Sequence, residues 1–346
     1  MRIVVPDLVT NTYFPALAAE ELGFFAAEGL DAHVELYNPV PRAMVALRDR
    51  VVDAVAGSAH PTPRAFPQWQ GAKLVVALSQ GTPWLLVVRA DLAAPRGDLQ
   101  ALKGLRIGAA HGPGAALERL LAHAGIDPAR DGVQIGPVPG ADAPGASFGV
   151  MAAQALEARQ LDGFWANALG SETAVRRGVG KILVDVRRGD GPPEAKDFTF
   201  SALITTEMLI AREPEQVAAA VRAIVKTQQA LRADPSQATT VGRRRFPPEA
   251  AEMIAVLVER DLPFYDPAIS AAAVAGLERF TLALGVLTAP VPYERRWWRR
   301  SSSRCGMAGS RETCAQRTLL LGRGMSNCAG TTQRKSSARC PCVERA

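Results

Sequence analysis

The segment His111-Gly112-Pro113-Gly114 is the best candidate for an anion site in this sequence. It stands between Ile107-Gly108, which has the character of a strand end, and a helical pattern. Unpaired N–H groups and the dipole at such a helix start favour a carboxylate, sulfonate or phosphate. We therefore predict ligand contacts from His111, Gly112 and Gly114. The segment has neither G-x-G-x-x-G nor a P-loop lysine, so it does not indicate a nucleotide.

Two other segments combine an aromatic ring with a hydrogen-bonding group. Trp165 and Asn167 follow an apolar run, where an indole can stack on a flat ligand and an amide can hydrogen-bond it. Thr82 and Trp84 stand before another apolar run, and Trp84 suits a hinge core as well as a binding wall. We predict that all four residues contact the ligand.

The last two candidate loops follow the first and third apolar runs. Asn11, Tyr13 and Phe14 precede a proline at a helix start, and we predict that they bind ligand. The alternative is that the two rings only staple the start of the helix. Ser58 and His60 lie in a small-residue turn that lets a polar ligand approach the backbone. We predict binding by both, although a histidine on a loop is often only solvated.

Enzymatic motifs are absent from the sequence. It has four histidines and neither H-E-x-x-H nor G-x-S-x-G. All five cysteines, from Cys305 to Cys342, lie near the C-terminus, so the first 290 residues offer no thiol nucleophile or thiolate ligand. We expect no catalytic residues, no metal and no cofactor.

Short apolar runs alternate with helical patterns, which is typical of βαβ units and a mostly parallel sheet. Helices are expected near 15–28, 41–50, 113–124, 148–159 and 170–178. From Pro214 to Pro235 the pattern is helical only, and further helices are expected over 247–260 and 267–286. The predicted strands are Arg2–Val5, Ala32–Leu36, Asp53–Ala56, Lys73–Leu78, Trp84–Val88, Leu105–Ala109, Val133–Val138, Leu161–Trp165, Lys181–Val186 and Phe200–Thr205.

Two similar α/β series open at Ile3-Val4-Val5-Pro6 and Leu105-Arg106-Ile107-Gly108. Such a repeat predicts two lobes with a ligand cleft between them, because open parallel sheets bind ligands at the carboxyl ends of their strands. A single large sheet is the alternative. Asp53 and Asp162 each begin a buried strand, and we expect them at the floor of the cleft.

Four segments resemble a known family. LAAEELGFFAAEGL at 17–30 is similar to the A-x-E-x-G-F-F-x-x-E-G-L segment of periplasmic substrate-binding proteins for nitrate, sulfonate and taurine ABC importers. The same superfamily includes the binding proteins for thiamine-pyrimidine precursors. ALRDRVVDA at 46–54 resembles its A-L-x-x-G-x-V-D turn, with Arg50 in place of glycine. LKGLRIG at 102–108 and ALEARQLDGF at 155–164 resemble the corresponding elements of the second lobe.

The resemblance implies a type II periplasmic-binding-protein fold. Lobe 1 would comprise residues 1–88 and 200–290, and lobe 2 residues 89–199, with crossings near Val88-Arg89 and Phe198–Ser201 as the hinge. It also implies a monomer that captures a small anionic or heteroaromatic solute (sulfonate, nitrate, taurine or pyrimidine type) for an ABC importer permease. The alternatives are an enzyme on the same fold, of decarboxylase or pyrimidine-synthase type, and a cytosolic ligand sensor.

The cellular location that the family resemblance implies differs from the one that the first residues of this sequence suggest. The resemblance implies the periplasm, whereas Met1-Arg2 leads directly into an apolar strand without a secretory leader. If Met1 is the true start, we expect a cytoplasmic protein.

Charge is unevenly spread along the chain. The net charge is +6, but residues 291–346 hold 12 basic and 3 acidic residues, which leaves 28 basic against 31 acidic in 1–290. A nucleic-acid partner is therefore not indicated for the main body.

The stretch 291–346 is rich in Ser, Arg and Cys without apolar periodicity, so we expect disorder. A basic tail can bind acidic partners or a membrane surface, and its composition is also typical of a shifted reading frame beginning close to Glu294.

Overall fold

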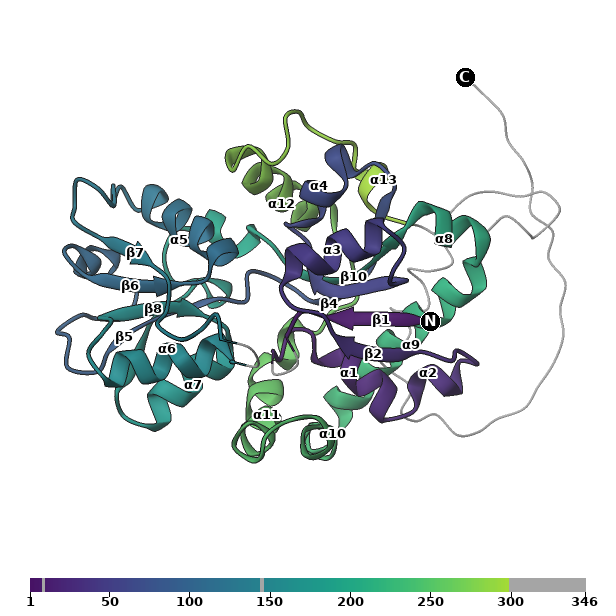
Figure 1. Ribbon diagram of the computed structural model, residues 1–346, viewed down its shortest axis with the longest axis horizontal. Coiled ribbons are helices and arrows are strands. Elements are labelled where there is room, and N and C mark those ends of the chain that lie inside the picture. The colour runs from purple at the N-terminus through teal and green to yellow at the C-terminus, as the bar shows by residue number, and fades with distance from the viewer. Residues whose placement is uncertain (8–9, 144–145, 299–346) are drawn as a thin grey trace, which may run out of the picture. The chain divides into compact units, whose positions relative to one another are not determined.

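The computed structural model describes residues 1–7, 10–143 and 146–298, with only the backbone described at 111 and 112. Within these residues the chain forms two five-stranded sheets with helices on both faces (Figure 1). Two lobes, rather than one large sheet, are therefore present. The predicted tail from residue 299 onward lies outside the described residues.

The first sheet has the strand order β2-β1-β3-β10-β4. Together with its helices we call it lobe 1. Its strands are β1 (Arg2–Val5), β2 (His33–Leu36), β3 (Ala54–Ser58), β4 (Ala72–Ser79) and β10 (Ser201–Thr206).

The second sheet has the order β7-β6-β8-β5-β9, and with its helices it forms lobe 2. Its strands are β5 (Leu85–Arg89), β6 (Arg106–Ala109), β7 (Gln134–Gly136), β8 (Gly163–Ala166) and β9 (Gly180–Asp185). All ten strands predicted from the sequence are thus present, with ends shifted by a few residues.

One strand in each sheet runs against the other four. β10 pairs antiparallel with β3 and β4, and β5 pairs antiparallel with β8 and β9. The reason is the chain path, because β5 and β10 are the strands that follow a crossing between lobes and so start where their neighbours end. The first crossing is therefore residues 80–84. The prediction of a crossing at Val88-Arg89 is wrong, since these residues end β5 inside the second sheet.

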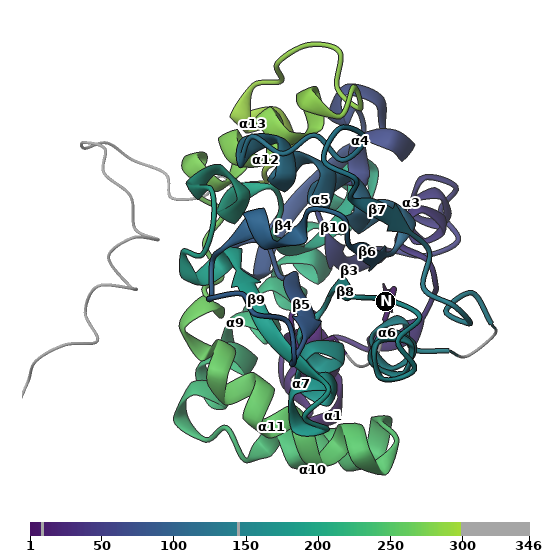
Figure 2. The same cartoon turned by 90° about the vertical axis from the view of Figure 1, so that its left-hand side faces the viewer.

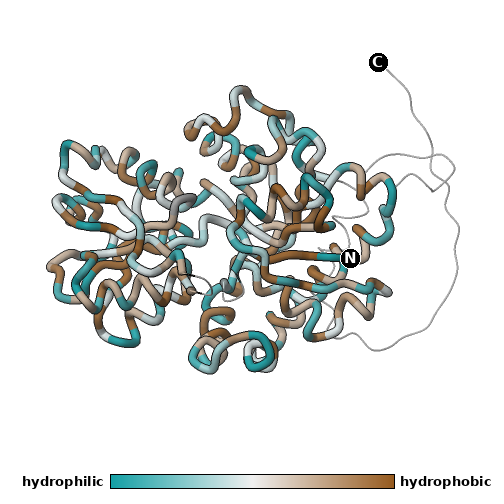
Figure 3. The backbone as a smooth tube through the Cα atoms, viewed as in Figure 1, coloured by the Kyte–Doolittle hydropathy of each residue, from teal (hydrophilic) through white to brown (hydrophobic). Residues whose placement is uncertain are grey.

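Alternating side chains of the strands supply a core on each face of a sheet. Ile3 and Val5 pack toward α1 and α9, while Val4 packs toward α3. In the second sheet Val88 packs toward α5 and Val87 toward the α6–α7 pair, which lie on opposite sides of that sheet (Figure 2). The hydrophobic residues accordingly gather along the central strands (Figure 3).

The helices agree with the predicted pattern, with four additions. α9 begins with Pro214 in its first turn and ends before Asp234, as predicted. The polar helix α10 and the short helices α4, α8 and α13 were not predicted. The helices are α1 (Phe14–Glu21), α2 (Phe24–Ala27), α3 (Val40–Arg48), α4 (Thr62–Ala65), α5 (His111–His123), α6 (Phe148–Glu157), α7 (Ala168–Arg176), α8 (Glu207–Arg212), α9 (Pro214–Ala233), α10 (Gln237–Arg245), α11 (Pro248–Asp261), α12 (Ala271–Ala283) and α13 (Tyr293–Arg296).

The expectation of disorder from residue 291 is wrong for its first eight residues. α13 packs against α12, and the Arg296 guanidinium is buried, 3.3 Å from Glu278 and 3.2 Å from the carbonyl of Val274. Trp297 then forms a bridge to Leu74 at the edge of β4. Apolar burial and a buried ion pair therefore hold this segment in spite of its basic composition.

In the described part of the chain, no helix combines the length and apolar character that spanning a membrane requires.

Candidate functional site

The candidate loops meet where the strand ends of the two lobes face each other, which we call the lobe junction. β4 and β9 lead directly into the two crossings, so the strands parallel to them end on the same edge of each sheet. Asn167 of lobe 2 confirms contact between the edges, because its Nδ2 donates to Asp7 Oδ2 and Thr10 Oγ1 of lobe 1, each at 3.1 Å. Thr10 Oγ1 also donates to Asp7 Oδ2 at 2.6 Å.

The Asn167 side chain has a second task in its own lobe. It is the N-cap of α7, where its Oδ1 accepts a hydrogen bond from the N–H of Gly170 at 3.3 Å. Capping fixes the orientation of the amide, so that its NH₂ points across the junction. Sequence position after a strand was the signal that found this residue, and the cross-lobe partners needed the fold.

Tyr13 and Ser58 form a buried polar pair from neighbouring elements of lobe 1. The two hydroxyl oxygens lie 3.0 Å apart. Burial raises the pKa of Tyr13 to about 12, so its phenol is neutral and can donate or accept one hydrogen bond. Phe14 instead belongs to the apolar core of lobe 1, where it packs against Phe246 with ring centroids 6.1 Å apart.

His60 is partly buried among protein groups and differs in this from a fully solvated loop histidine. Its Nδ1 lies 3.2 Å from Thr199 Oγ1, and its ring meets those of Trp84 and Phe280 edge-on at 5.5 and 5.8 Å. Burial, with a smaller contribution from the charge of Arg64, lowers the pKa of His60 to about 3. His60 is therefore a neutral imidazole at pH 7 and a very weak base, which is a poor match for general acid–base catalysis.

Trp84 and Trp165 pack beside each other within lobe 2, with ring centroids 6.0 Å apart. Both are buried in the apolar core of lobe 2. The Trp165 indole N–H has no hydrogen-bond partner among the described residues. Thr82 is also buried, and its Oγ1 accepts from the N–H of Thr199 at 3.4 Å.

The start of α5 lies next to Trp165. Ala109, the last residue of β6, is in register with Trp165 of β8, and α5 begins two residues later. The Gly114 N–H donates to the carbonyl of Ala110 at 2.7 Å. Only the backbone is described at His111 and Gly112, so the prediction of ligand contacts from these two residues stays a prediction.

Asn11 is directed away from the other candidates. Its side chain donates to Asp261, and its carbonyl accepts from the Tyr265 hydroxyl at 2.6 Å. Sequence reasoning also missed the polar groups Asp7, Thr199 and Asp261. Asp7 follows β1 and could have been found by that rule, whereas nothing in the sequence pointed to Asp261.

Two acidic residues lie at the opposite edge from the one predicted. Asp53 accepts a hydrogen bond from the backbone N–H of Arg2 at 2.8 Å, and Asp162 accepts from Arg106 Nε at 2.9 Å. Arg2 and Arg106 begin β1 and β6, so both carboxylates lie at the amino edges of the sheets. The expectation that they form the floor of the cleft is wrong, because ligand-facing loops follow strands rather than precede them.

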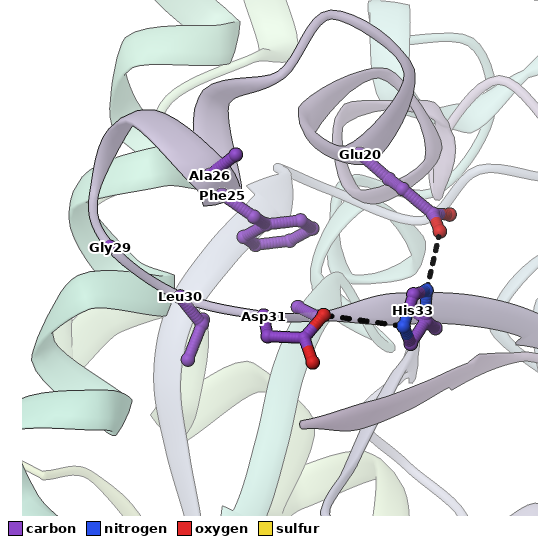
Figure 4. Close-up of a pocket in the computed structure, with 8 residues that line it drawn as sticks. Glu20, Phe25, Ala26, Gly29, Leu30, Asp31 and His33 are labelled. Carbon is purple, nitrogen blue, oxygen red and sulfur yellow. Dashed lines mark ion pairs between the residues drawn. The ribbon is translucent and has the colours of Figure 1, made fainter.

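Two open surface pockets lie elsewhere in lobe 1. One of about 400 Å³ is lined by residues that include Glu20, Phe25, Asp31 and His33 (Figure 4). There His33 lies 3.4 Å from Glu20 and 3.3 Å from Asp31. Another of about 280 Å³ lies between Tyr37 and Val51. Neither contains a predicted site residue. Within residues 1–7, 10–143 and 146–298, no group of three His, Cys, Asp or Glu side chains is placed to hold a metal.

Solved structures of several proteins share this fold. A protein from Bordetella bronchiseptica RB50 is 20% identical, with TM-score 0.67, over 86% of this chain and 94% of that one. The periplasmic aliphatic sulphonate binding protein SsuA from Escherichia coli is 14% identical, with TM-score 0.64, over 92% and 98%. The desulfurization enzyme DSZB is 17% identical, with TM-score 0.59, over 84% and 94%. The type II binding-protein fold inferred from the sequence is therefore present.

Among curated proteins no sequence matches this one. The model of the NMT1-like family matches residues 8–243, which is more than half of the chain. Those residues include every predicted ligand contact in both lobes. The chain belongs to the NMT1-like family.

Proposed function

We propose that this protein captures a small solute at the lobe junction and delivers it to an ABC importer. Membership of the NMT1-like family and a fold shared with a sulphonate-binding protein support this role. The two crossings at 80–84 and 186–200 suit a hinge, since movement of two lobes about such segments is a common way to enclose a ligand. The expected partner is a permease, and the expected location is the periplasm.

The observation that carries the proposal is the unpaired Trp165 indole N–H. A buried donor without a partner costs about 1–3 kcal/mol, and Trp165 is 0% exposed. A ligand acceptor atom would remove this cost. Thr12 Oγ1, also buried and without a partner among the described residues, lies in the lobe 1 loop that Asn167 contacts.

The donors at the junction are uncharged, and this bears on the class of solute. Trp165, the Tyr13–Ser58 pair and the N–H groups at the start of α5 can hold an oxygen or ring-nitrogen acceptor. The Trp84 and Trp165 rings favour a flat group beside it. A sulfonate, nitrate, taurine or pyrimidine-type solute has these features in different proportions.

A thermal-shift screen tests the proposal. Benzenesulfonate, taurine, nitrate, aromatic acids and pyrimidines are added to the full chain, and we expect at least one to raise the melting temperature in a saturable way. Trp165→Phe keeps a ring but removes the N–H, so we expect it to reduce that shift strongly. Trp69→Phe is the matched control, because Trp69 is equally buried and its N–H is also unpaired, but it lies before the start of β4, whose other end leads to the junction. Equal loss of the ligand shift in both variants would count against the site.

An enzyme is the second candidate, favoured by the shared fold with the desulfurization enzyme DSZB. Tyr13 and His60 are two groups with acid–base capacity at the junction, and their pKa values lie near 12 and 3. Both are far from the neutral range that proton transfer uses best. Product analysis by mass spectrometry after incubation with each solute decides between the two, since turnover of any one would support the enzyme.

A further inference from the structure

Asp261, the last residue of α11, is a completely buried carboxylate surrounded by donors. Its Oδ2 accepts hydrogen bonds from Asn11 Nδ2 and Arg187 Nη2. Its Oδ1 accepts from Arg188 Nη2 at 2.9 Å and from Arg260 Nε at 3.1 Å. Burial by itself would raise the pKa of this carboxyl, but the neighbouring arginines hold it at about 2. The group is thus an anion throughout the physiological range.

The partners of Asp261 come from different parts of the chain. Asn11 lies in the candidate binding loop before α1. Arg187 and Arg188 belong to a 3-10 turn, Val186–Arg188, that opens the return crossing from lobe 2. Tyr265, just after α11, donates to the Asn11 carbonyl at 2.6 Å. The C-terminal end of α11 therefore contacts both the loop that contains Asn11 and the return crossing.

Arg187 extends this cluster to the outgoing crossing. Its Nη1 donates to Ser79 Oγ, at the end of β4, at 3.3 Å. At Gly81, inside the crossing 80–84, an added Cβ would lie only 2.9 Å from Arg187 Cγ. The guanidinium also lies over the Phe264 ring, 4.2 Å from its centroid. Arg187, which belongs to the return crossing, thus also contacts the outgoing crossing, and its ion pair with Asp261 fixes its position.

We propose that Asp261 is a positioning residue for solute capture, which braces both crossings and the Asn11 loop in one charged cluster and so sets how readily the lobes move. This inference rests on the proposed function, in which the lobes close over a solute. Removal of the carboxylate charge leaves Arg187 as an uncompensated buried cation, a state that proteins relieve by local rearrangement. The rearrangement would fall on the crossings, because Arg187 touches both.

Hydrogen–deuterium exchange on the full chain, without added solute, tests the brace. In Asp261→Asn we expect several-fold faster exchange at residues 10–14, 80–84 and 186–200, with the central strands β1 and β6 unchanged. Glu28→Gln is the matched control, because the Glu28 side chain is only 8% exposed and pairs with Arg222 and Lys226 of α9, which are not part of the crossings. Its faster exchange should be confined to α2 and the part of α9 that faces it.

Two outcomes would overturn the brace. One is unchanged exchange at 80–84 and 186–200. The other is uniform acceleration across both sheets, which would mark Asp261 as a contributor to global stability only. If Asp261→Asn does not fold, Arg188→Gln removes one partly exposed partner, and the same pattern is expected in weaker form. The exchange experiment needs no bound solute, so it tests the brace alone. A parallel thermal-shift measurement with benzenesulfonate tests solute binding separately.

Discussion

Burial makes two titratable side chains at the junction neutral. Tyr13 has its pKa raised to about 12 and His60 its pKa lowered to about 3, in each case chiefly because the charged form would lose its hydration. Both therefore act as uncharged hydrogen-bonding groups at pH 7. These groups would then select a solute by its shape and by the positions of its hydrogen-bond acceptors, rather than through a fixed positive charge.

His60 gives a pH prediction. Unfolding returns its pKa to 6.5, so between pH 6.5 and about 3 the unfolded chain binds a proton that the folded chain does not. Stability should fall as the pH drops through this window, by up to about 1.4 kcal/mol per pH unit. His60→Gln should flatten this part of the curve of melting temperature against pH, whereas His33→Gln, at an exposed position, should not. A slope that persists unchanged in His60→Gln would contradict the assignment.

At the scale of elements, α6 and α7 start side by side because two glycines meet there. An added Cβ at Gly170 would lie 2.4 Å from the Cα of Gly149 and 2.7 Å from its carbonyl oxygen. This approach places the first turns of both helices next to Asn167, the cap of α7. The close crossing thus helps to set where the Asn167 amide lies at the junction.

Gly170→Ala tests the crossing. The methyl group must push the two helix starts apart, and overpacking of this kind costs about 1–3 kcal/mol. We expect a lower melting temperature and, because Asn167 moves, a smaller solute shift. Gly136→Ala in β7 is the control, since an added Cβ there has nothing within 4 Å. Equal melting temperatures of the two variants would refute the crossing argument.

At the scale of the whole described molecule, two separate sheets are linked by two crossings and by side chains that meet at the junction. Asn167 is the direct hydrogen-bonding link from lobe 2 to the loop after β1. The Asp261 cluster acts at the crossings instead. Loss of the Asn167 link should therefore favour opening without loosening the hinge.

Asn167→Ser tests this division of roles. Serine keeps an oxygen that can cap α7 but cannot reach Asp7 and Thr10 across the junction. We expect a melting temperature close to that of the parent chain and a larger radius of gyration by small-angle X-ray scattering. Scattering identical to that of the parent chain would show that the link does not hold the lobes together.

The amino-acid sequence by itself determined the order and type of the elements. Alternation of buried runs and helical stripes is local, so β1, β10 and α9 could be placed within a residue or two. α10 was missed because only Ala238, Val241 and Gly242 of its nine residues are buried, and its pattern is otherwise polar. The six-residue α8 has too few turns for a periodic signal.

Only the tertiary structure decided which side chains meet. Arg187 and Asp261 are 74 positions apart, and Asn11 and Asp261 are 250 apart. Such pairs depend on the path of the chain between them, which no local period contains. The same holds for the crossing at 80–84 and for the enclosure of His60, because strand pairing and burial are properties of the assembled sheets. The sequence thus named most of the junction's residues, while the fold decided which of them meet one another and which lie apart.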